Sequence, residues 1–84
     1  MTPEFKILLD ALDELNGLLE ADALPDVCIP RSIHIEVLLA AIPGDHSEHV
    51  PLAVARALGR MAKSMDLYRE RWMVRLHAKT TSLQ

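Results

Sequence analysis

Cysteine, glycine and aromatic residues are all scarce in this chain of 84 residues. Cys28 is the only cysteine, which excludes a disulfide within one chain and leaves no cysteine-rich spacing for structural zinc. Three glycines and five prolines are too few for a loop-rich or disordered chain. A chain this short buries only about 60–65% of its unfolded surface, so its stability must come from helix packing and from association.

Long apolar runs and export signals are also lacking. The longest uncharged apolar run, residues 37–43, is far too short to span a membrane. The first residues, Met1 to Glu4, lack the basic and apolar regions of a secretory signal. Together with the single thiol, these absences predict a cytoplasmic protein.

The charges that are present divide along the chain. Residues 1–48 carry ten acids and two bases, whereas residues 49–84 carry seven bases and two acids. The pattern of apolar residues places most of these charges on the outer faces of helices. We therefore interpret the division as two surfaces offered to a partner, rather than as contacts that hold the fold together.

Apolar spacing predicts an all-α fold, a small bundle of three main helices that forms a single domain over residues 1–84. The first helix is expected over residues 3–23, because Thr2 can cap it and leucines recur behind it at spacings of three and four. Residues 24–30 contain two prolines and are expected to be a connection. Residues 32–42 are apolar on nearly all sides, which predicts a helix buried at the centre of the bundle.

A long amphipathic helix is predicted over residues 51–79, followed by a frayed tail over residues 80–84. Such a helix would span about 43 Å, whereas a compact domain of this size is only about 30 Å across. The helix must therefore either break, with Gly59 as the expected position, or extend beyond its own domain. An extended stripe with Tyr68 and Trp72 would need a second chain to cover it, so we expect a homodimer.

Groups that could perform chemistry are few. No residue that could act as a base lies at a spacing that would place it beside the Cys28 thiol, so Cys28 is interpreted as a small buried hydrophobe. His34 is interpreted as a boundary or core residue. His46 and His49 could reach one metal ion from a single helical turn, but no third ligand is evident and a polar segment that caps the last helix is the favoured interpretation. We expect no catalysis, no cofactor, no bound metal and no small-molecule substrate.

Binding is predicted instead on the last helix, where residue types common in interface hot spots gather. The alternative is that Tyr68 and Trp72 belong to the core. The function that this pattern favours is a non-catalytic protein–protein interaction module, a small adaptor, chaperone, immunity or inhibitor-type protein of bacterial or phage type, which binds another protein, itself or both. The candidate partner-binding residues are Met65, Tyr68, Arg69, Arg71, Trp72 and Arg75.

A nucleic-acid-binding alternative rests on two features. Arg56, Arg60 and Lys63 form a basic stripe that could follow a phosphate backbone. The second feature is the segment Val27-Cys28-Ile29-Pro30-Arg31-Ser32-Ile33-His34, followed by Gly44, Ser47 and residues 54–58.

This segment resembles the ribbon-helix-helix family, in which a short strand ends in Ile-Pro or Leu-Pro and two helices follow. The resemblance covers about 32 of the 84 residues. It implies dimerisation through strand pairing and a DNA-binding transcriptional regulator. The sequence departs from the family at Asp26 and Cys28, where base-reading polar or basic residues are usual, and Pro43 and Pro51 interrupt the turn and the second helix.

Overall fold

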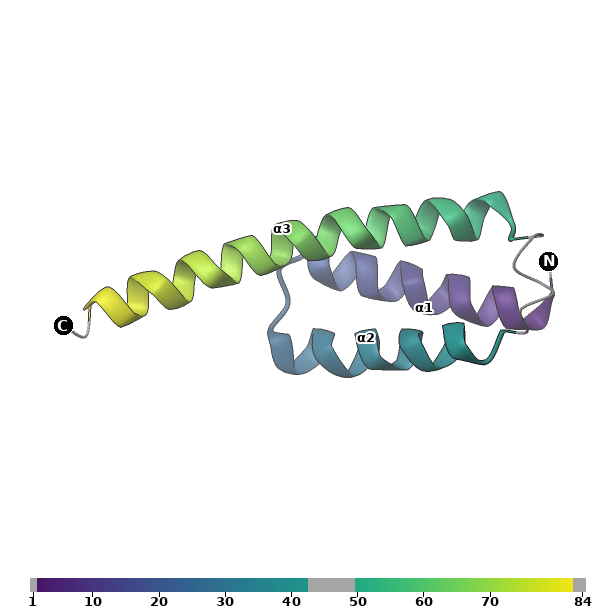
Figure 1. Cartoon of the computed structure of the whole chain (residues 1–84), viewed down its shortest axis with the longest axis horizontal. Coiled ribbons are helices and arrows are strands. Elements are labelled where there is room, and N and C mark those ends of the chain that lie inside the picture. The colour runs from purple at the N-terminus through teal and green to yellow at the C-terminus, as the bar shows by residue number, and fades with distance from the viewer. Residues whose placement is uncertain (1, 43–49, 83–84) are drawn as a thin grey trace.

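The computed structural model describes residues 2–42 and 50–82, which form three α-helices and no strand. The helices are α1 (Pro3–Glu20), α2 (Pro25–Ala40) and α3 (Leu52–Ser82). α1 lies between the other two and packs against both, whereas the backbones of α2 and α3 do not approach each other (Figure 1). The predicted all-α arrangement of three helices is confirmed.

The start of α1 follows from its sequence. The Thr2 hydroxyl accepts a hydrogen bond from the backbone N–H of Phe5 at 3.4 Å, and Pro3 occupies the first helical position. The predicted apolar stripe is buried along its whole length, and Leu12 and Leu15 are fully inaccessible to solvent. α1 therefore supplies the centre of the core.

The end of α1 comes at Glu20, three residues before the predicted end. Asp22 adopts a left-handed conformation with φ of 59°, and the N–H groups of Asp22 and Ala23 donate to the carbonyls of Leu19 and Leu18 at 3.1 and 2.9 Å. These two bonds form a Schellman motif, which usually places glycine in the left-handed position and here uses aspartate. The turn that follows leads directly into α2.

The predicted connection over residues 24–30 is wrong, because α2 already begins at Pro25. Pro25 suits a first helical turn, where its missing N–H has no partner to lose. Pro30 lies inside the helix, but only in its second turn, where it removes a single bond to the Asp26 carbonyl. Two prolines five residues apart are thus both compatible with one helix.

The expectation that the second helix is buried at the centre is also wrong. Cys28 and Ile35 are its only buried residues, whereas Ile33 and Val37 are 54% and 60% exposed. A helix whose backbone packs against a single neighbouring helix buries mainly one side, whatever the polarity of its other sides. α2 consequently presents an apolar outer surface.

α3 does not break at Gly59 and continues to Ser82, beyond the predicted end at residue 79. Its 31 residues extend past the ends of α1 and α2 (Figure 1). The molecule measures 54 × 19 × 19 Å, and its radius of gyration of 15.4 Å exceeds the value of about 12 Å that a compact chain of this length would have. We call residues 76–82 the α3 overhang.

Candidate partner-binding groove

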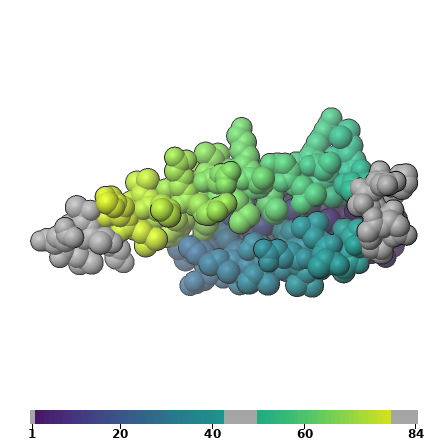
Figure 2. All heavy atoms as spheres, in the orientation of Figure 1, coloured from purple at the N-terminus to yellow at the C-terminus, as the bar shows by residue number. Residues whose placement is uncertain are grey.

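An apolar groove lies between α2 and the C-terminal half of α3, beside the turn that joins α1 to α2. It holds about 360 Å³ and is open to solvent along one side. Leu15 and Leu19 of α1 form its floor. Figure 2 shows α3 projecting beyond the end of α2 on this side of the molecule.

The two walls of the groove are almost entirely apolar. The α2 wall is formed by Pro25, Cys28, Ile29 and Ser32. The α3 wall combines partly buried and exposed side chains, and Met73 and Leu76 are 69% and 59% exposed. It is formed by Met65, Tyr68, Arg69, Trp72, Met73 and Leu76.

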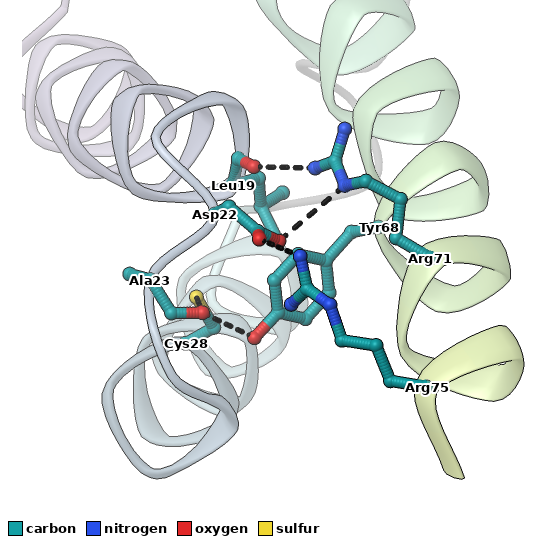
Figure 3. A network of polar contacts seen from close by, with 7 residues as sticks. All are labelled: Leu19, Asp22, Ala23, Cys28, Tyr68, Arg71 and Arg75. Atoms are coloured by element: carbon teal, nitrogen blue, oxygen red, sulfur yellow. Dashed lines mark hydrogen bonds and ion pairs between the residues drawn. The ribbon is translucent and has the colours of Figure 1, made fainter. Parts of the chain in front are cut away.

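A polar network at the α1–α2 turn holds α3 in place beside the groove (Figure 3). Arg71 donates to the carbonyl of Leu19 at 2.9 Å and pairs with the Asp22 carboxylate at 3.3 Å. Arg75 pairs with the same carboxylate. The hydrogen bond from Arg75, together with the two positive charges, lowers the pKa of Asp22. One carboxylate thus receives two arginines from successive turns of α3.

Tyr68 belongs to this network and to the core. Its side chain is 8% exposed, and its hydroxyl donates to the backbone carbonyl of Ala23. The Cys28 thiol lies 3.8 Å from the same carbonyl oxygen. Burial, reinforced by Cys28, raises the pKa of Tyr68 to about 12. The ring therefore anchors α3 while one of its faces still borders the groove.

Trp72 stands at the wall of the groove, between Tyr68 and Arg75. The Tyr68 and Trp72 ring centroids are 6.1 Å apart and tilted by 53°. The Arg75 guanidinium lies 4.8 Å from the centre of the Trp72 ring, within the range of a cation–π contact. The indole is thereby held in one orientation, with part of its surface left open.

The six predicted partner-binding residues therefore separate into two groups. Met65, Tyr68, Arg69 and Trp72 line the groove. Arg71 and Arg75 instead bind the end of α1 and the turn, although Arg75 also contacts Trp72. Bases of the C-terminal half of the chain thus pair with acids of the N-terminal half inside the fold, and Arg60 does so as well, with Glu20 of α1 at 2.6 Å.

The three residues proposed for nucleic acid, Arg56, Arg60 and Lys63, are all exposed on α3, and one of them is paired with an acid of α1. Arg60 is bound to Glu20, and the hydrogen bond from this arginine is the main reason that the pKa of Glu20 is lowered. Arg56 and Lys63 have no ion-pair partner among residues 2–42 and 50–82. Residues 27–30 are helical, so the strand that the ribbon-helix-helix resemblance implies does not form there.

Sequence reasoning missed the whole α2 wall, which includes Ile29 and Ser32. The signal was present, since Pro25 followed by Asp26 is a common helix start, but the second proline at position 30 outweighed it. Met73 and Leu76 also line the groove and are not among the predicted binding residues. Their importance depends on a facing α2 that sequence spacing did not predict.

No cluster of three or more potential metal ligands occurs within the described part of the chain. His46 and His49 lie outside the described residues. His34 is exposed on α2. Within the same described ranges, no helix has the length and apolar character to cross a membrane.

Comparison of the chain with protein-family models, with curated proteins and with solved structures found no match.

Proposed function

We propose that this protein is a non-catalytic protein–protein interaction module that binds a helix in the groove between α2 and α3. The observation that carries the proposal is the groove itself, an open apolar concavity bordered by exposed Ile29, Met73 and Leu76. A contiguous group of exposed apolar residues on a small protein commonly marks a site where a protein or another ligand binds.

A helix is the occupant that the arrangement favours. α2 and α3 both pack on α1 without approaching each other, which is the arrangement of three adjacent members of a four-helix bundle. A fourth helix would lie opposite α1 and contact both walls, as amphipathic helices do when they bind in a groove. Met65 and Met73 are flexible side chains that can adapt to the surface they meet.

The class of protein that fits is a small adaptor, chaperone, immunity or inhibitor-type protein, which binds another protein, a second copy of itself, or both. The DNA-binding alternative has weaker support. It loses the strand on which the family resemblance depends, and Arg60 is engaged with Glu20. Arg56 and Lys63 alone provide few phosphate contacts.

The test compares one groove variant with one matched control. Ile29→Glu places a charge on the α2 wall, and Leu52→Glu places the same charge at an exposed position at the other end of α3. A protein captured from the native host by the wild type should also be captured by Leu52→Glu and be lost with Ile29→Glu. The purified partner should then bind directly and shift the emission of Trp72, the single tryptophan.

Equal capture of that protein by both variants would contradict the proposal, as would direct binding that leaves Trp72 emission unchanged. Far-ultraviolet circular dichroism of both variants separates loss of binding from loss of folding. The exposed position of Ile29 makes a folded Ile29→Glu variant the expected result.

A further inference from the structure

We infer that the partner helix bound in this groove carries a lysine or arginine on the edge that lies along α2, opposite Glu36. The inference rests on the proposed function of the groove and names the chemistry of its partner. The other side of the partner helix would be apolar and would lie on Leu15, Leu19 and Trp72, which line the groove.

The apolar part of the groove is short. Its α2 wall extends from Pro25 to Ser32 and its α3 wall from Met65 to Leu76, which correspond to about 11 and about 17 Å along the two helix axes. A bound helix therefore has two to three turns in apolar contact, or about four side chains. With so few apolar contacts, charged groups at the edges of the groove decide which partner binds.

Glu36 lies at the α2 edge of the groove, one turn beyond the apolar part. It follows Ser32 by four residues and Ile29 by seven, so the three side chains lie along the same side of α2. A helix packed alongside α2 has the same rise per residue. Its base is therefore expected about seven residues, or two turns, from the apolar residue that contacts Ile29.

The surroundings of Glu36 favour a cation. Its side chain is exposed and has no ion-pair partner within the described ranges. It lies near the C-terminal end of α2, where the helix dipole is negative and the last turn contains no base. Asp26, the other unpaired acid of α2, lies instead in the first turn, where the positive end of the helix offsets its charge.

The bases of α3 do not offer an equivalent site to an acidic partner. Arg69 already pairs with an acid of its own helix, and Arg75 pairs with the acid of the α1–α2 turn. Arg56 and Lys63, the bases without an ion pair in the described part of α3, precede Met65 by nine and two residues and so lie on the side of α3 away from the groove. An acidic partner would have to displace an existing pair, whereas a basic partner gains Glu36 without breaking one.

Fluorescence titration of the full chain with two synthetic peptides tests the inference. Both peptides have about 18 residues, which is about 27 Å of helix, with leucine and alanine on one face. The other face carries lysine in one peptide and glutamate in its twin. The lysine peptide should bind and shift the emission of Trp72, the single tryptophan, and the glutamate peptide should bind at least tenfold more weakly at low salt.

Glu36→Lys and Asp10→Lys separate the charge at the groove edge from the net charge of the chain. Both residues are exposed acids, so both variants change the net charge of −3 by the same amount. Asp10 precedes Leu19 by nine residues and lies on the side of α1 opposite the groove floor. Glu36→Lys should weaken binding of the lysine peptide at least threefold and strengthen that of its twin, whereas Asp10→Lys should change both by less than about twofold.

Equal binding of the two peptides overturns the inference, and so does an equal effect of the two lysine variants, which would reflect net charge alone. Binding of neither peptide also overturns it, and a wild type that is dimeric by sedimentation equilibrium would then identify a second copy as the occupant. Ile29→Gln removes an apolar contact without adding charge. Preferred binding of the glutamate peptide that is lost with Ile29→Gln would contradict this inference alone, whereas peptide binding that Ile29→Gln leaves unchanged would contradict the proposed function. Circular dichroism verifies that each variant is folded, as the exposure of all three positions predicts.

Discussion

Asp22 shows how one residue can set both a turn and a tertiary contact. Its left-handed backbone ends α1, and the same conformation directs its carboxylate to Arg71 and Arg75 of α3. Asparagine tolerates this conformation about as well as aspartate but carries no charge. Asp22→Asn therefore separates the contribution of the charge from that of the turn.

We expect the stability advantage of the wild type over Asp22→Asn to shrink on acidification. The pKa of Asp22 is lowered in the folded state, so the stabilisation by its charge is complete above its unfolded value of about 3.9 and is lost as the pH falls through the folded value. Urea denaturation midpoints of the two proteins, measured from neutral pH down to about pH 2, provide the test. A constant difference across that range would show that the ion pairs do not couple to folding.

Tyr68 gives a second prediction at this scale, and as the single tyrosine it can be titrated without ambiguity. Its tyrosinate absorbance should appear near pH 12 in the folded protein and near pH 10 in urea. Because the folded pKa is raised, the associated stabilisation is complete below about pH 10 and is lost as the pH rises toward the folded value. Tyr68→Phe should lack this alkaline loss and cost about 1 kcal/mol at neutral pH, since the Ala23 carbonyl loses a donor.

At the scale of elements, local signals were sufficient where a helix has one amphipathic face and a standard cap. Thr2 and the leucine stripe predicted α1 and its buried side, and the spacing of α3 predicted a long helix. α2 could not be assigned in the same way, because its two prolines and uniform polarity give no information on which neighbours it contacts. That information depends on the turn at Asp22, where aspartate fills a position at which glycine would have been the recognisable signal.

Gly17 and Gly59 test whether α1 and α3 are uninterrupted helices. Neither would bring an added Cβ within 4 Å of another group, and neither has a positive φ. Replacing each by alanine should therefore raise the free energy of unfolding by roughly 0.5–1 kcal/mol, because alanine restricts the unfolded chain and favours the helix. The double variant should show the sum, since neither added Cβ meets another group within 4 Å. A loss of stability with Gly59→Ala would mean that α3 bends there in solution.

At the scale of the whole molecule, the sequence indicated only that the last helix was too long for a compact domain. It led to four of the groove residues, Met65, Tyr68, Arg69 and Trp72, because all four lie on one helix. The opposite wall and the floor come from α2 and α1, and only their packing brings these residues to the same place. A binding site formed between elements is thus harder to predict than one formed on a single element.

The overall shape provides the last prediction, which tests the homodimer expected from the length of α3. One chain has a radius of gyration of 15.4 Å and a longest dimension of 54 Å. Antiparallel overlap of residues 64–82 over about 28 Å, with the two α3 helices about 10 Å apart, would separate the centres of the two copies by about 28 Å. The dimer would then have a radius of gyration of about 21 Å. Two chains packed side by side along their whole length would have a value of about 18 Å, because each body is 19 Å across and their centres would lie about that far apart. Small-angle X-ray scattering distinguishes these values, and Met73→Glu should return the scattering to that of a single chain, because it would place two like charges beside the two-fold axis. A dimer of about 18 Å would mean that the chains pair along their bodies and not through the C-terminal half of α3.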